Sequence, residues 1–256
     1  MDSKHPAATP LETIDALLTR SKRSNLPLRQ SFVQQGRGKS RSPGPAAAFL
    51  TRRDPRALDL YLLIHAVASA EPYDVTLPAA TWARALNLSI DKTGNATKSS
   101  RTAVSKALAR LEKLQLITRS RKGKRSCITI LDEGGHGEPY KRPATRYFKL
   151  PYDYWREEWH LKLVSSEKFV LLVSLSLKDG FPLPAERAPD WYGVSADSVQ
   201  KGLSGLRQHG LLQFESIPRK APLAPRGFTE QRLYTLQPPF GPHKRIRVPE
   251  KSKGNK

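Results

Sequence analysis

Apolar residues recur along the chain at helical spacing and in short strand-like runs, and the same order of segments occurs twice. In the first copy, Asp54-Pro55 precedes an amphipathic segment, and proline is favoured at the first position of a helix. A short run at 74–77 is typical of a strand, and Pro78 begins a second predicted helix. This part of the chain therefore predicts helix, strand and helix in succession.

A third helix and a β hairpin complete the first copy. Either Thr97 or Ser99 is a suitable N-cap for this helix. Residues 116–118 and 127–131 are predicted strands, and the basic run 119–125 forms the tip between them. The predicted apolar face of the helix consists of Val104, Ala107, Leu108, Leu111 and Leu114.

The second copy has the same succession of elements. Residues 148–151 form a short predicted strand, and a strongly apolar helix begins near Ser165. A further helix begins near Ser195, and residues 211–214 and 232–236 are the strands of a second hairpin.

A shift of 95 residues aligns the two copies without a gap over the third helix and the start of the hairpin. Every aligned core position keeps a small or apolar residue, which favours a duplication over two unrelated helical bundles. The aligned pairs are Val104 with Val199, Ala107 with Gly202, Leu108 with Leu203, Leu111 with Leu206, Leu116 with Leu211 and Ile117 with Leu212.

The stretch from Ser100 to Leu108, followed by Leu116 to Arg119, resembles the recognition helix and wing of bacterial winged-helix regulators. A chain with two such units is similar to plasmid replication initiators, which also pair two of them. The resemblance implies a mainly α chain with small β wings (α+β), built from two tandem winged-helix domains with basic disordered tails. We expect an arm at 1–53, winged-helix domains at 54–133 and 148–241, a linker at 134–147 and a tail at 242–256.

Charge indicates the class of partner. Lys and Arg total 44 against 23 Asp and Glu, a formal net charge of +21, which favours a polyanion such as nucleic acid. Residues 1–53 carry a net charge of +7, and 242–256 carry +5. We expect both segments to be largely disordered and to attract anions without specificity, with an arm in the DNA minor groove as the alternative. Within the first segment, Leu11, Ile14, Leu17 and Leu18 have the spacing of a short helix.

The first copy has the stronger charge signal for duplex DNA. Residues 97–125 hold 10 basic residues and one acidic residue, whereas the matching stretch 196–226 holds five and two. We expect helix 97–114 in the major groove and wing 117–131 on the phosphates. The base-contact candidates are Arg101, Thr102, Ser105 and Lys106. The phosphate-contact candidates are Lys98, Ser99, Arg110, Arg119, Arg121, Lys122, Lys124 and Arg125.

The second copy is expected either to contact DNA or to form a protein or homodimer interface. Its prolines, among them Pro218, Pro222 and Pro225, stiffen the hairpin tip, which carries fewer charges than the first tip. Its DNA-contact candidates are Gln200, Lys201, Ser204, Arg207, Arg219 and Lys220.

Residue types needed for catalysis or metal binding do not cluster. The histidines are isolated, Gly134 to Gly137 lacks the Gly-Lys-Ser/Thr sequence of a phosphate-binding loop, and Cys127 is the single cysteine. We therefore expect no enzyme activity, no catalytic residues, no metal and no cofactor. No apolar run is long enough for a membrane span or follows Met1 as in a secretory leader, so we expect a bacterial cytoplasmic, nucleoid-associated protein without membrane contact.

These observations favour a sequence-specific double-stranded DNA-binding protein, a bacterial transcriptional regulator. The first alternative is a replication initiator of a plasmid or mobile element, which would bind tandem repeats and recruit replication proteins. The second is an adaptor that uses its helices as protein-docking surfaces.

Overall fold

The computed structural model describes residues 7–89, 91, 96–123 and 125–241. Its α-helices are α1 (Pro10–Thr19), α2 (Ala46–Thr51), α3 (Pro55–Val67), α4 (Ala79–Ala85), α5 (Lys98–Lys113), α6 (Asp153–Arg156), α7 (Trp159–Lys162), α8 (Ser165–Ser176), α9 (Ala188–Tyr192) and α10 (Ala196–Gln208). Its strands are β1 (Asn25–Arg29), β2 (Gln34–Gln35), β3 (Ser42–Pro43), β4 (Asp74–Thr76), β5 (Ile117–Lys122), β6 (Arg125–Ile130), β7 (Tyr147–Pro151), β8 (Leu212–Lys220) and β9 (Phe228–Leu236). Short 3-10 helices lie at Gln30–Phe32, Gly38–Ser40 and Ala185–Arg187.

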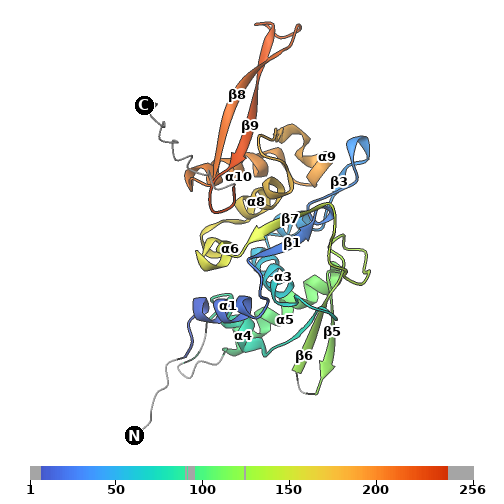
Figure 1. Ribbon diagram of the computed structural model, residues 1–256, viewed down its shortest axis with the longest axis vertical. Helices are drawn as coiled ribbons and strands as arrows, with labels where there is room; N and C mark the ends of the chain where they lie inside the picture. The colour runs from blue at the N-terminus through green and yellow to red at the C-terminus, as the bar shows by residue number, and fades with distance from the viewer. Residues whose placement is uncertain (1–6, 90, 92–95, 124, 242–256) are drawn as a thin grey trace, which may run out of the picture.

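The first copy forms a helical layer with a three-stranded sheet at its edge. Asp54 caps α3 by accepting a hydrogen bond from the backbone N–H of Ala57, and Pro55 occupies the first helical position. Strand β6 lies between β4 and β5 in an antiparallel sheet. The hairpin β5–β6 extends away from the helices at one end of the molecule (Figure 1).

The second copy places α8, α9 and α10 beside a long two-stranded hairpin. Ser195 caps α10 by accepting a hydrogen bond from the backbone N–H of Ser198. The hairpin β8–β9 pairs from Leu212 opposite Leu236 to Lys220 opposite Phe228. It projects from the end of the molecule opposite to β5–β6 (Figure 1).

Residues 7–53 are folded, so the expectation of a largely disordered N-terminal arm is wrong, although the short helix expected around Leu11 to Leu18 is present as α1. Thr9 and Glu12 form a reciprocal capping box at the start of α1, and β1 pairs antiparallel with β7. Leu26 and Leu28 of β1 are fully buried, as is Phe32 directly after it. Burial of these side chains stabilises the segment despite its basic composition. The tail at 242–256 lies outside the described residues.

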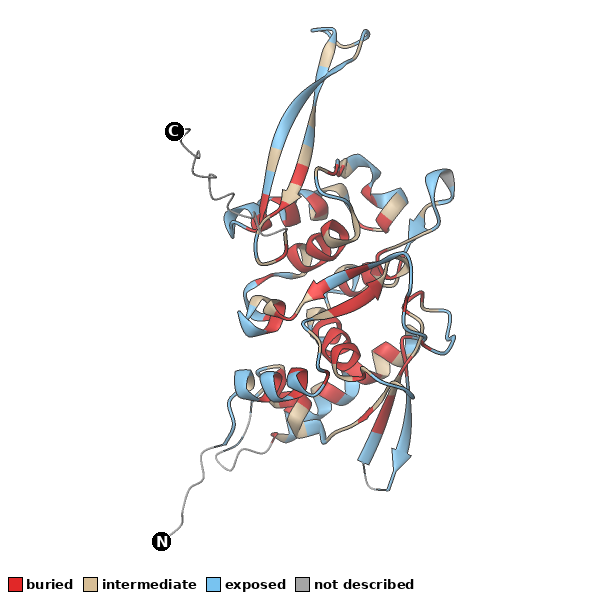
Figure 2. Cartoon of the chain, in the orientation of Figure 1, coloured by how far each residue is buried: buried red, intermediate tan, exposed pale blue. Residues whose placement is uncertain are grey.

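The sheet β1–β7 lies in the middle of the molecule, between the two copies (Figure 1). Buried apolar residues from the N-terminal segment and both copies form one connected hydrophobic cluster. Figure 2 shows buried segments running through this region, whereas the two hairpins are largely exposed. The N-terminal segment thus forms part of the core that joins the two copies.

The expected fold class, a mainly α chain of two tandem winged-helix domains with disordered tails, is contradicted. Of the described residues, 43% are helical and 22% are in strands, distributed over several small sheets, which makes the fold mixed α/β. The helix–hairpin order within each copy is present, but β1 adds a sheet between the copies that the repeat pattern did not predict.

Candidate nucleic-acid interface

Helix α5 has one buried face and one basic, polar face. Thr97 caps it by accepting a hydrogen bond from the backbone N–H of Ser100. The buried face consists of Ser100, Val104, Ala107, Leu108 and Leu111. All four base-contact candidates, Arg101, Thr102, Ser105 and Lys106, are exposed.

The exposed face of α5 is available for a ligand. Within the described residues, none of the four base-contact candidates has a side-chain hydrogen bond or an ion pair, and the same holds for Lys98. The one carboxylate of α5 is that of Glu112, in the last turn of the helix. The first three turns therefore present cations and hydroxyl groups without a competing anion on the same helix.

The hairpin β5–β6 carries further cations next to its turn. Arg121 pairs with Ser126 and Lys122 with Arg125 across the strands, and Gly123 adopts the left-handed conformation of the turn. The side chains of Arg121 and Arg125 are exposed and have no partner in the described part of the chain. Lys124, another phosphate-contact candidate, lies outside the described residues.

Three of the basic phosphate-contact candidates already have intramolecular partners, and the hydroxyl of Ser99, another candidate, lies 2.9 Å from that of Thr97. Arg110 forms a two-pronged ion pair with Asp54, the N-cap of α3. Arg119 pairs with Glu112, with its Nε 2.7 Å from Oε2. These contacts fix α5 against α3 and against the start of the hairpin, so we assign both arginines first to positioning.

The third such candidate is Lys122, whose Nζ lies 2.5 Å from Oδ2 of Asp74. The thiol of Cys127 donates to the same oxygen at 3.2 Å. The hydrogen bond from Lys122, followed by that from Cys127, lowers the pKa of Asp74. The pair thus fixes the turn end of β5 to β4, and among the described cations Arg121 and Arg125 are left free near the turn.

Helix α10 presents the second set of candidates. Gln200, Lys201, Ser204 and Arg207 are exposed on the side opposite to its buried residues. Lys201 pairs with Asp197 one turn earlier, at 2.8 Å. The Arg207 guanidinium lies 4.5 Å from the ring centroid of Phe214 on β8.

A groove of about 1310 Å³ runs between α10, β9 and the loop before α9. The N-terminal segment contributes to it, because the Arg41 guanidinium lies 4.2 Å from the ring of Trp191. Sequence reasoning missed Arg41, since nothing local indicates that β3 packs against α9. The groove also includes Gln200, Ser204, Arg207, Arg219 and Arg232.

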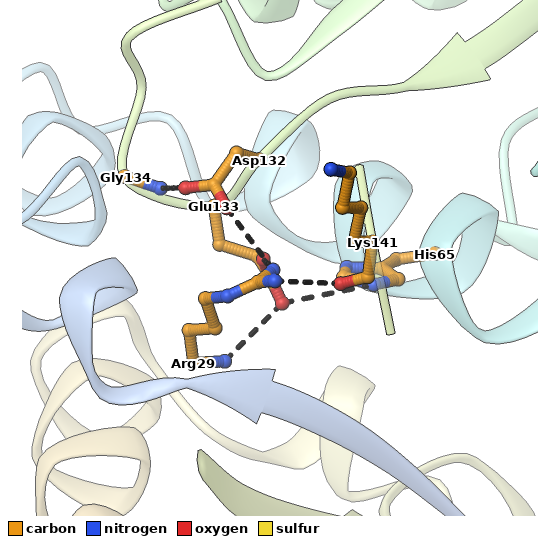
Figure 3. Close-up of polar contacts among 6 residues, drawn as sticks. All are labelled: Arg29, His65, Asp132, Glu133, Gly134 and Lys141. Carbon is orange, nitrogen blue, oxygen red and sulfur yellow. Dashed lines mark hydrogen bonds and ion pairs between the residues drawn. The ribbon is translucent and has the colours of Figure 1, made fainter. Parts of the chain in front are cut away.

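A buried polar cluster joins β1 to the segment after β6 (Figure 3). Glu133 is fully buried, and its Oε2 lies 2.5 Å from Nη1 of Arg29, which also lies 3.1 Å from Asp132. Burial raises the pKa of Glu133, and the arginine opposes that effect. Nη2 of Arg29 donates to the carbonyl oxygen of Lys141 at 2.6 Å.

His65 lies beside this cluster, with Nε2 3.9 Å from Oε1 of Glu133 (Figure 3). Burial lowers the pKa of His65 to about 3, and its ring meets that of Tyr140 edge-on. Glu133 and His65 are closed to solvent, whereas the side chains of Arg29 and Asp132 remain 23% and 25% exposed. We assign the cluster a structural role, because it holds the N-terminal segment and the predicted linker against α3.

Neither metal ligands nor membrane-spanning helices are found in the described ranges. No group of three or more His, Cys, Asp and Glu side chains there could hold a metal ion. No described helix is both long and apolar enough to cross a bilayer. Comparisons of the chain with models of protein families, with curated proteins and with solved structures found no match.

Proposed function

We propose that the chain is a sequence-specific double-stranded DNA-binding protein that places α5 in the major groove. The observation that carries this proposal is the exposed face of α5, where Arg101 and Lys106 have no partner among the described residues. An α-helix fits the major groove of B-DNA, where each base pair presents a distinct pattern of donors and acceptors.

The exposed residues of α5 can contact base edges in two ways. Arg101, in the first turn, can donate two parallel hydrogen bonds to the O6 and N7 atoms of guanine. Thr102 and Ser105 are short hydroxyl side chains that can donate to or accept from a base edge. Loss of one such bidentate contact costs about 1–3 kcal/mol of discrimination between bases.

The hairpin β5–β6 suits contact with the phosphate backbone. Arg121 and Arg125 are exposed beside the turn, and guanidinium groups bind phosphate oxygens strongly without reading sequence. In this proposal α5 supplies specificity and the hairpin supplies affinity.

The biological role that we propose is regulation of transcription in a bacterium. A replication initiator that binds tandem repeats is the second candidate, favoured by the presence of two exposed helix–hairpin surfaces in one chain. The buried contacts that join the copies would hold those surfaces at a fixed spacing, as iterated sites require. A site with two repeats in the same direction would favour the initiator, and one palindrome would favour the regulator.

The proposal can be tested by fluorescence anisotropy with the full chain and a labelled pool of 30-bp duplexes of mixed sequence. We expect Arg101→Ala combined with Lys106→Ala to weaken binding about tenfold or more at 0.1 M salt, because two groove-facing cations are lost. The matched control is Arg142→Ala combined with Lys149→Ala, which removes two exposed cations outside both helix–hairpin surfaces. Equal loss in both double variants would show that total charge, not α5, determines binding.

A further inference from the structure

The hairpin β8–β9 has nine paired positions in each strand, more than any other strand pair among the described residues. At about 3.4 Å per residue, its arms are roughly 30 Å long. Strand β8 is exposed from Glu215 to Lys220, β9 is at least partly exposed from Phe228 to Leu233, and the arms project from one end of the molecule (Figures 1 and 2). Because the outer part of this ribbon packs against little of the fold, we infer that it contacts a ligand.

The tip of this hairpin is an ordered turn made of apolar residues. Backbone hydrogen bonds join Ala221 to Gly227 at 2.9 Å and Ala224 to Ala221 at 2.9 Å. Pro222 and Pro225 restrict the backbone on both sides of Leu223. The Leu223 side chain is 100% exposed, although the fold buries most of its other leucines. A rigid turn therefore presents one fully solvated leucine at the far end of the arm.

The charge around this leucine identifies the chemistry of the partner. Residues 219–228 carry three basic side chains and no acidic one. Arg219 and Lys220 are exposed and have no ion-pair partner in the described chain, and the Arg226 guanidinium lies over the ring of Phe228. An apolar point surrounded by cations complements a polyanion with an apolar interior, which is the character of stacked bases between two phosphate backbones.

We propose that β8–β9 enters the minor groove of duplex DNA and that Leu223 inserts between two base pairs and bends the duplex. The inference rests on the proposed DNA-binding function and adds bending to it. Leucine and proline are among the residues that minor-groove proteins insert between base steps, and such insertion kinks DNA by roughly 20–90° toward the major groove. Residues 221–225 offer alanine, proline and leucine but no side chain that reads base edges, which favours a wedge over a major-groove reader.

The position of the arm in the molecule agrees with this role. The hairpins β5–β6 and β8–β9 project from opposite ends of the long axis (Figure 1). In this proposal a duplex that meets α5 bends so that its minor groove meets the tip of the long arm. Contact with Arg219, Lys220 and Arg226 on the two backbones would hold the arm in the groove while Leu223 acts at its end.

The test is ligase-catalysed circularisation of a linear duplex of about 100 bp, which is shorter than the roughly 150-bp persistence length and closes poorly unless it is bent. We expect the full wild-type chain to raise the yield of circles about tenfold and Leu223→Ser to abolish most of that gain. Because Leu223 is fully exposed, the substitution leaves the core intact. Leu223→Phe should retain bending, since phenylalanine is also a wedge residue.

The matched control is Val164→Ser, a similar change at another exposed apolar side chain, just before α8, where serine is an acceptable N-cap. It should circularise DNA like the wild type. Anisotropy with the same linear duplex separates the two proposals. Binding without circularisation, or circularisation unchanged in Leu223→Ser, overturns the wedge and leaves the DNA-binding proposal standing. Absence of any duplex binding by the wild type overturns both.

Discussion

The Lys168 ammonium lies 2.6 Å from Oδ2 of Asp59, which places a buried ion pair between α8 of the second copy and α3 of the first. Tyr154 donates to the other oxygen of the same carboxylate at 3.0 Å. Together with the sheet β1–β7 and the pair of Arg29 with Glu133, this contact fixes the two helix–hairpin surfaces relative to each other. A ligand that contacts both helix–hairpin surfaces must therefore match their fixed spacing.

Removal of one partner from this pair should destabilise the whole chain. We expect Lys168→Met to lower the free energy of unfolding by about 3–5 kcal/mol, because the Asp59 carboxylate is left buried without its cation. The double variant with Asp59→Leu should recover at least half of that loss. Urea unfolding followed by circular dichroism measures both. A single variant as stable as the wild type would contradict this role of the pair.

Asp54 performs two tasks that different substitutions separate. Asp54→Ala removes both the N-cap of α3 and the partner of Arg110, so we expect it to lower stability by about 1–2 kcal/mol. Asp54→Asn keeps the cap and should cost less. Thermal unfolding of the two variants gives the comparison. If asparagine destabilises as much as alanine, the ion pair with Arg110 matters more than the cap.

The salt dependence of DNA binding should distinguish free cations from paired ones. Arg125→Gln should reduce the slope of log affinity against log salt by about 0.9, the value for one lost phosphate contact. Arg119→Gln should change the slope less, because Glu112 already neutralises that guanidinium. The slope is obtained from DNA affinities measured at several salt concentrations between about 50 and 200 mM. Equal slopes for both variants would show that the ion pair opens on binding.

Stability should decrease in mild acid because His160 is buried. Burial, with a smaller contribution from Lys168, lowers its pKa from 6.5 to about 4. The unfolded chain therefore binds more protons between these values, and stability falls as the pH decreases through that window. At pH 5 the loss attributable to this histidine is about 2 kcal/mol.

The matching test compares urea unfolding at pH 8 and pH 5 for two variants. His160→Leu should reduce the pH-dependent loss by about 2 kcal/mol, whereas His136→Gln, at an exposed position, should leave it unchanged. If His160→Leu leaves the pH dependence unaltered, the pKa of His160 does not differ between the folded and unfolded states.

Features that depend on neighbouring residues were predictable from the sequence. The structure selects Thr97 from the two N-cap candidates and leaves Arg101 exposed, as expected. The buried face of α5 has the expected residues except Leu114, which is the C-cap and only partly buried, and it also includes Ser100. The same local signals gave the start of α3 at Pro55 and of α10 after Ser195.

Features that depend on distant residues were not predictable. Arg29 and Glu133 are 104 residues apart, and neither stands in a pattern that indicates the other. Pro27 lies inside β1, where proline argues against a strand, yet β1 pairs only with β7 and a sheet of two strands has two edges. The ion pair of Arg110 with Asp54 was equally unpredictable, because the two residues are 56 positions apart. Long-range pairing, rather than local propensity, turned a basic segment into part of the core.

The most direct test of the central proposal is selection of bound sequences from a random duplex library by the full chain at physiological salt. We predict enrichment of one defined motif, in which Arg101→Ala relaxes a single position while Arg125→Gln weakens all sequences alike. No enrichment, together with binding that disappears steeply as salt rises, would contradict sequence-specific recognition by α5 and leave only non-specific attraction by the net charge of +21.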